Sequence, residues 1–208
     1  MDPSETPEQR FWRWFKGEEA SLGAFDPVAD PEGADEILDR VLERLADVQA
    51  GLTCEIGPTR EDGRREFIIS ADGIRERFPA VRRLALAAPP LKHWKPVAFR
   101  PRQEIGYTVN IDGFILDPDH VWFRAAPKGS QVELDLYVKD FSAHPRNTVL
   151  RAGYVLLDSA LGELDVETKV AGIGWHDLPA DPALKGLTAF ALLPEVVDRL
   201  VPGPPRGA

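Results

Sequence analysis

Cysteine is nearly absent from this sequence of 208 residues, and Cys54 is its one example. A single cysteine excludes a disulfide within the chain, and the apolar-polar alternation around it predicts a small buried side chain. Long apolar runs are also missing, so no segment predicts a membrane-spanning helix. The acidic start, MDPSETPEQR, does not fit a secretory signal, and we expect a cytoplasmic protein.

Motifs of catalytic and nucleotide-binding sites are missing as well. Neither of the common glycine-rich phosphate loops occurs, and Ser70 and Ser159 lack the G-x-S-x-G context of a nucleophile elbow. The four histidines are isolated, with no pair at helical spacing, so each is expected to be a surface or turn residue. The sequence therefore predicts no catalytic residue and no cofactor.

Charged side chains are abundant but unevenly distributed, and the net charge is −9. Residues 1–62 carry 16 acidic and 6 basic side chains, residues 63–102 carry 3 and 10, and residues 103–208 carry 15 and 9. A pI near 5.0 argues against sequence-blind binding to nucleic acid. The basic segment 64–102 either binds an anion or is neutralised by the acidic helices of its own chain.

Apolar periodicity predicts an α+β fold with a largely antiparallel sheet and helices packed on one face. Helices are expected at 7–22, 34–48, 79–88, 147–161 and 194–201, and strands at 52–56, 65–70, 94–99, 107–111, 121–125, 132–138 and 164–170. The three strands from 107 to 138 read as a meander. We expect one domain over 1–208, with frayed ends at 1–6 and 202–208 and a seam at 102–106.

One strand is especially regular. Between 132 and 138, valine and leucine alternate with Glu133, Asp135 and Tyr137. Such alternation is typical of a sheet with one buried face and one solvent-exposed face. Near the start of the chain, Phe11, Trp14 and Phe15 share one helix face, which is expected to cover the open side of a sheet.

The basic segment supplies the candidate binding residues. They are cations and one aromatic side chain that would offer a stacking surface if it were exposed: Arg82, Arg83, Lys92, Trp94, Arg100 and Arg102. Strand alternation places only Trp94 on the same side as Arg100, so a full stacking patch is not implied. The competing interpretation is that these cations pair with the acidic N-terminal helices.

A second candidate lies in the predicted strand 164–170. There, Asp165, Glu167 and Lys169 recur at every second position and would share one strand face. Two carboxylates and a lysine could hold a divalent cation and orient a water for hydrolysis. The triplet from Glu167 to Lys169 resembles the acid-x-lysine element of restriction-endonuclease-like nucleases. The competing interpretation is the solvent-exposed face of an ordinary strand.

Several segments together resemble a group of uncharacterised bacterial proteins of similar length. They are FWRWF, LTCEIGP, REFIISADGI, FPAV, AAP, FRPR and LLDSALGELDVETKV, in that order. The resemblance implies one compact α+β unit in the bacterial cytoplasm. It implies no activity and no catalytic residue.

Three hypotheses of function follow. The first is a non-enzymatic protein that binds a protein partner through the exposed sheet face or the arginine-rich helix, as an immunity or accessory protein would. The second is a metal-dependent hydrolase or nuclease using Asp165, Glu167 and Lys169. The third is binding of single-stranded nucleic acid through Lys92, Trp94 and neighbouring arginines. No oligomeric state follows from the sequence.

Overall fold

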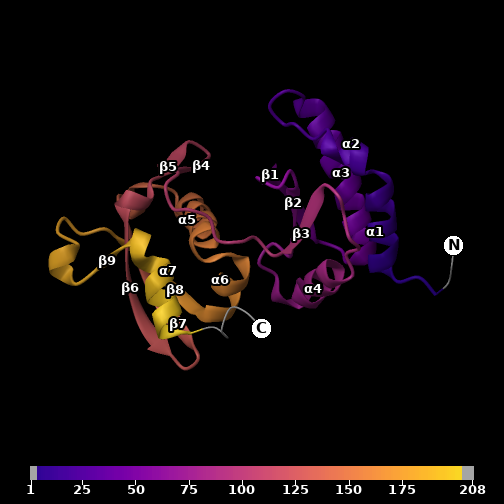
Figure 1. The fold of residues 1–208 in the computed structure, drawn as a ribbon. Coiled ribbons are helices and arrows are strands. Elements are labelled where there is room, and N and C mark those ends of the chain that lie inside the picture. Colours follow the sequence, from indigo (N-terminus) through magenta and orange to yellow (C-terminus); the bar gives the residue numbers. More distant parts are fainter. Residues whose placement is uncertain (1–3, 203–208) are drawn as a thin grey trace. The chain divides into compact units, whose positions relative to one another are not determined.

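The computed structural model describes residues 4–202, apart from the side chain of Pro58 (Figure 1). The chain divides into two compact units, Met1–Arg100 (unit 1) and Pro101–Ala208 (unit 2). Their boundary lies directly before the predicted seam at 102–106, and the expectation of one domain stays a prediction. No helix among the described residues is long and apolar enough to cross a membrane.

Unit 1 combines four helices with a three-stranded sheet of order β1-β2-β3 in its described residues. The elements are α1 (Pro7–Gly17), α2 (Glu19–Gly23), α3 (Pro31–Val48), β1 (Thr53–Thr59), β2 (Arg65–Ser70), α4 (Phe78–Leu86) and β3 (Trp94–Ala98). The β1–β2 pair is antiparallel, whereas β3 runs parallel to β2. The predicted helices and strands of this half are present within a few residues at each end, except that the single helix predicted at 7–22 is divided at Glu18 into α1 and α2.

The start of unit 1 is ordered by a helix cap. The Thr6 hydroxyl accepts a hydrogen bond from the Gln9 N–H (3.2 Å), and the Gln9 side chain accepts one from the Thr6 N–H (2.9 Å). Pro7 follows at the first helical position, where its missing N–H costs nothing. The prediction of a frayed end at 1–6 is thus wrong for Thr6, and positions 1–3 and 203–208 lie outside the described residues.

Aromatic side chains form the centre of unit 1. Phe15 packs on Phe67 of β2 and Trp94 of β3, with ring centroids 4.8 and 5.5 Å away. The Trp12 indole N–H donates to the Leu84 carbonyl oxygen of α4 at 2.7 Å. The expectation that the aromatic face of the first helix covers a sheet is confirmed for Phe11 and Phe15, which are buried. The third buried aromatic residue is Trp12, whereas Trp14, which was predicted to share the face, is only half-buried.

Unit 2 contains a four-stranded sheet of order β8-β7-β6-β9 and a separate β4–β5 pair. The elements are β4 (Val109–Ile111), β5 (Phe114–Leu116), β6 (Val121–Lys128), β7 (Gln131–Val138), α5 (Arg146–Leu161), α6 (Glu163–Lys169), β8 (Val170–Asp177), β9 (Thr188–Ala189) and α7 (Leu193–Leu200). The β7–β8 pair is parallel and the other pairs in this unit are antiparallel.

One buried face of this sheet carries the core of unit 2. Val132, Leu134, Leu136 and Val138 are almost fully buried and join apolar side chains of α5, α6 and α7 in one cluster. In contrast, Glu133 lies on the exposed side of the same strand. The predicted fold class is confirmed: an α+β fold with mostly antiparallel sheets, and with one solvent-exposed sheet face in unit 2.

Two local predictions in unit 2 are wrong. The predicted meander does not form, because β4 pairs with β5 in a sheet of its own rather than with β6. The predicted strand 164–170 is mostly the helix α6, and a strand begins only at Val170. Gly162, with a φ of 80°, ends α5 and allows the chain to turn into α6.

Candidate functional site

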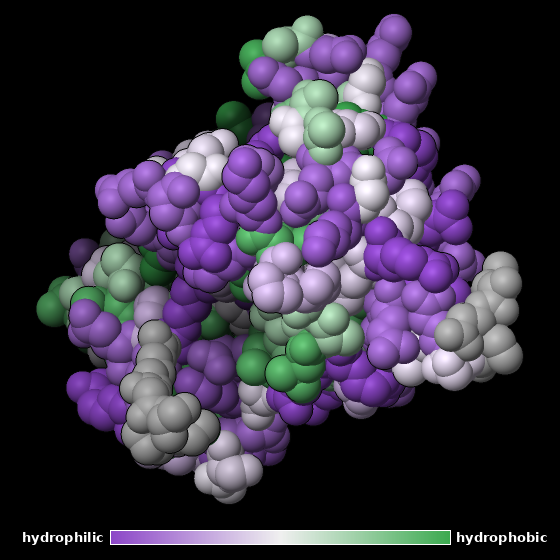
Figure 2. All heavy atoms as spheres, turned by 45° about the vertical axis from the view of Figure 1, so that its right-hand side comes forward, coloured by the Kyte–Doolittle hydropathy of each residue, from purple (hydrophilic) through white to green (hydrophobic). Residues whose placement is uncertain are grey.

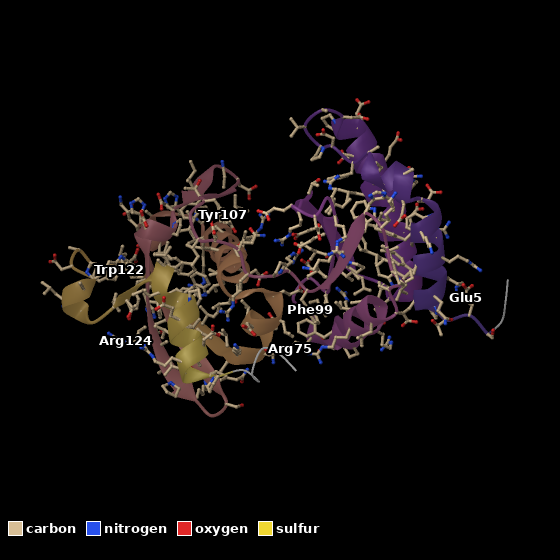
Figure 3. All side chains as sticks on the ribbon, in the orientation of Figure 1. Glu5, Arg75, Phe99, Tyr107, Trp122 and Arg124 are labelled. Carbon is tan, nitrogen blue, oxygen red and sulfur yellow. The ribbon has the colours of Figure 1, made fainter. Side chains whose placement is uncertain are left out.

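The exposed sheet face of unit 2, called the outer face, is built as three rows of side chains across β6, β7 and β8. Strand register aligns Trp122 with Tyr137 and His176, and it aligns Arg124 with Asp135. Figure 3 labels Trp122 and Arg124, which come from β6. The rows are Trp122–Tyr137–His176, Arg124–Asp135–Gly174 and Ala126–Glu133–Gly172.

The first row presents two aromatic rings and an imidazole. The His176 ring stacks on Tyr137, with centroids 4.8 Å apart and planes inclined by 25°. Trp122 and Tyr137 are half-buried, so parts of both rings face solvent. Because the Tyr137 and His176 rings stack on each other, this part of the row loses little conformational freedom when a partner binds.

The first and second rows are linked by a hydrogen bond between His176 Nε2 and Asp135 Oδ1, 2.9 Å apart. Both side chains are 41–45% exposed. A Cβ atom on Gly174 would lie 2.3 Å from Asp135 Oδ1 and 3.0 Å from His176 Nε2. The bond therefore depends on glycine at position 174, because any side chain there would force the two groups apart.

A shallow hollow of about 370 Å³ lies on the outer face. It is lined by Arg124, Ala126, Glu133, Asp135, Ile173 and Gly174. The Arg124 guanidinium donates to the Lys185 carbonyl oxygen at 3.2 Å, and Lys128 pairs with Glu133 at 2.7 Å. The hollow thus offers both donors and acceptors, beside the aromatic row.

The predicted binding cations are largely neutralised within their own units. Arg83 pairs with Glu8 of α1 at 3.0 Å, and the Arg82 guanidinium lies 5.8 Å from the centroid of the Phe99 ring. Arg100 pairs with Asp72 at 3.2 Å and also with Glu55. Lys92 is exposed. The pairing expected with an acidic N-terminal helix is therefore found for Arg83, whose partner lies on α1.

Trp94 does not offer the stacking surface that the sequence suggested. Its side chain is 2% exposed and packs against Phe15 inside the aromatic centre of unit 1. The Arg65 guanidinium covers it at 5.8 Å from the ring centroid. A nucleic-acid base cannot reach this ring, so the stacking part of the nucleic-acid hypothesis is wrong.

Arg102 belongs to a charged cluster of unit 2. Its guanidinium contacts Asp165 at 2.5 Å and Asp198 of α7 at 2.7 Å, and Lys169 pairs with both aspartates at 3.0 and 3.1 Å. Hydrogen bonding from Arg102, together with Lys169, outweighs burial and holds the pKa of Asp198 well below its ordinary value. The cluster ties α6 and α7 to the segment that precedes β4.

The metal-site hypothesis loses its geometric basis. Asp165 and Glu167 lie on a helix rather than on one strand face, and successive odd positions of a helix point in different directions. Asp165 is already paired with two cations. Across residues 4–202, no group of three or more histidine, cysteine or acidic side chains is arranged to hold a metal ion. A metal-dependent hydrolase stays a prediction from residue types alone.

Unit 1 also has a hollow, of about 600 Å³, between α1 and α3. Three of the side chains that line it are arginines, but each has a partner. Arg10 donates to the Glu5 carbonyl oxygen at 2.6 Å, and Arg13 pairs with the Glu5 carboxylate at 2.9 Å. Arg44 lies 5.6 Å from the centroid of the Trp14 ring. These arginines therefore connect the two helices and the segment before α1.

The sequence pointed to part of the outer face and missed the rest. Alternation in β7 placed Glu133, Asp135 and Tyr137 on the exposed side, as the structure has them. His176 was expected to be an isolated surface residue, because β8 was not predicted. Comparison with protein-family models, curated proteins and solved structures finds no match to this chain.

Proposed function

We propose that this chain works by binding a protein partner through the outer face of unit 2. The observation that carries the proposal is the row of Trp122, Tyr137 and His176, which lies half-exposed beside a hollow lined by charged groups. Tryptophan, tyrosine and arginine are the residues most enriched at the energetic centres of protein interfaces.

The pairing of the basic segment supports this choice of face. Figure 2 shows one side of the molecule, on which hydrophilic residues predominate and hydrophobic ones form small separate areas. The basic segment, the alternative binding region, has most of its cations paired or stacked within the chain. A partner that displaced those pairs would have to replace interactions already present, whereas the aromatic row can be covered without such a loss.

The test compares capture of partners by three forms of the chain. Wild type and Leu86→Ala, which trims a side chain that is 86% exposed in unit 1, should retain the same stoichiometric partner from native lysate. The double variant Trp122→Ala/Tyr137→Ala should lose it while keeping a wild-type circular dichroism spectrum. Equal capture by all three forms would place the interface elsewhere, and absence of any stoichiometric partner of wild type would count against the proposal.

A further inference from the structure

The sheet edges of this chain differ in how they are protected against pairing with another strand. In unit 1, β3 carries Lys95 and Pro96, and β1 has a register shift between Ile56 and Thr59. Proline, lysine and bulges are the usual devices that block an exposed edge. In unit 2, β9 has only two residues.

β8 is the least protected of these edges. It is eight residues long, pairs with β7 on one side only within the described residues, and contains neither proline nor lysine. Its register with β7 shifts between Val170 and Gly172, but the pairing is regular from Gly172 to Asp177. Alternate backbone N–H and C=O groups of such a strand point away from its neighbour. β8 therefore offers a long row of hydrogen-bonding groups for an added strand.

On the inner side of the sheet, apolar surface continues up to this edge. Ile173 and Trp175 are only half-buried, although both face the core. The Trp175 ring contacts Tyr154 of α5, which is 45% exposed, with centroids 5.8 Å apart. Every second residue of an added strand would meet this surface, and apolar side chains would bury it.

On the outer side, β8 presents glycines beside carboxylates. Gly172 is aligned with Glu133, and Gly174 with Asp135. A side chain of an added strand would lie next to each glycine and about 10 Å from β7, two strand spacings away. Arginine or lysine is long enough to lie across the glycine toward the carboxylate. The present partners of Glu133 and Asp135 are exposed, so exchanging them costs little.

We infer that β8 accepts an added β-strand from the partner: an extended segment in which apolar residues alternate with arginine or lysine. This inference rests on the proposed function, since it names the partner's chemistry and its mode of binding. Backbone hydrogen bonds provide the affinity, and the two sets of side chains provide the specificity. The net charge of −9 favours a basic segment.

A second copy of this chain fits the edge less well. If the β8 strands of two copies paired, the glycines of one copy would lie opposite the glycines of the other or beside its carboxylates. Glu133 and Asp135 of both copies would lie on the same side of the combined sheet, flanking the new strand pair. The carboxylates would gain no cation, and the space over Gly172 would stay unfilled. Self-association is therefore an alternative outcome of the test.

The direct test uses a capped synthetic peptide of about ten residues in which valine alternates with arginine. Hydrogen exchange of the full chain should slow at the amides of residues 171–175 when this peptide is present. Two control peptides should give no protection: one with glutamate in place of arginine, and one N-methylated at alternate backbone nitrogens. Protection by the glutamate peptide equal to that by the arginine peptide, or none by either, would overturn the inference.

A glycine variant tests the same edge. A Cβ at Gly172 meets only Glu133 Oε1, at 3.8 Å, so Gly172→Lys is compatible with the fold and places a blocking lysine at the edge. We expect it to weaken binding of the arginine peptide at least tenfold. Gly106→Lys is the matched control, since a Cβ there meets no atom within 4 Å, and its affinity should stay that of wild type. Equal affinities of the two variants would contradict the inference.

Three further measurements distinguish binding of a basic strand from self-association and from failure of the proposed function. Glu133→Gln leaves the backbone edge intact and should lower the preference for arginine over glutamate peptide, even if Gly172→Lys proves unstable. A concentration-dependent dimer of wild type that Gly172→Lys abolishes would replace the basic segment with a second copy. If the natural partner is lost from Trp122→Ala/Tyr137→Ala but kept by Gly172→Lys, the proposed function stands and the strand addition fails.

Discussion

At the scale of single residues, Cys54 is half-buried rather than fully buried as the alternation predicted, and its surroundings still suppress its reactivity. Burial, with a smaller contribution from Glu55, raises the pKa of the thiol to about 12. Only the thiolate is nucleophilic, so at pH 8 the folded chain should react with iodoacetamide on the order of a hundredfold more slowly than the chain in denaturant. Mass spectrometry of alkylation over time measures both rates. Similar rates would show that the thiol is accessible and ionised.

The same scale gives a pH dependence through Asp198. Its pKa in the folded chain is lowered, chiefly by hydrogen bonding to Arg102, so its carboxylate stabilises the fold above about pH 4, the ordinary aspartate range. That stabilisation is lost as the pH falls through the lowered pKa. Asp198→Asn should reduce the free energy of unfolding at pH 7 by about 1 kcal/mol, a value discounted for screening because the side chain is 40% exposed.

Urea unfolding at two pH values checks this assignment. The difference between Asp198→Asn and wild type should be smaller at pH 3 than at pH 7, because protonation of Asp198 in the unfolded chain removes part of the wild-type advantage. Asp181→Asn, at an exposed position, serves as the control and should change little at either pH. A constant difference would assign the effect of Asp198 to packing rather than to charge.

At the scale of elements, β8 packs closely on α5 because Gly153 of α5 has no side chain. A Cβ on Gly153 would lie 2.2 Å from the Trp175 ring. Gly153→Val should therefore force the indole outward and destabilise the chain by about 1–3 kcal/mol, the usual cost of overpacking. Thermal unfolding and the emission wavelength of tryptophan report the two effects. Gly106→Val, where a Cβ meets open space, should leave both unchanged.

The same region shows why part of the fold could not be read from the sequence. From 163 to 169, polar and apolar residues largely alternate, which is the strand period, yet the residues form α6. Its buried positions, Glu163 and Val166, are three residues apart, which is helical spacing. The helical spacing was hard to recognise in the sequence because one of the buried residues is a glutamate. The charged residues Asp165 and Lys169, at i and i+4, also support the helix by pairing along it.

The sequence did not predict β8, because its residues give little local indication of a strand. Gly172 and Gly174 have low strand propensity, and no local signal outweighs them. Pairing with β7 and packing of Ile173 and Trp175 on the core make this segment a strand, and both are tertiary effects. Consequently Asp135 could be placed on an exposed face from the sequence, but its partner His176 could not.

At the scale of the whole molecule, several cations of the basic segment are paired within the chain. The sequence offered two interpretations of the basic segment, an anion site or neutralisation by acidic helices. Arg83 is paired with Glu8 of α1, 75 residues earlier, and Arg102 with Asp198, 96 residues later. Totals of charge could suggest such pairs, but only the fold could select them, since the partners are distant in sequence.

The division into two units leads to the last prediction. The hydrophobic cluster of unit 2 is made by residues from Val109 to Val197, and its sheet pairs only with strands of the same unit within the described residues. A segment with its own core can fold by itself. We therefore expect residues 101–208, expressed alone, to give a dispersed amide NMR spectrum and a cooperative urea transition. A collapsed spectrum without a transition would mean that unit 2 needs unit 1, as the sequence prediction of one domain implies, and the edge of β8 would then have to be tested in the full chain only.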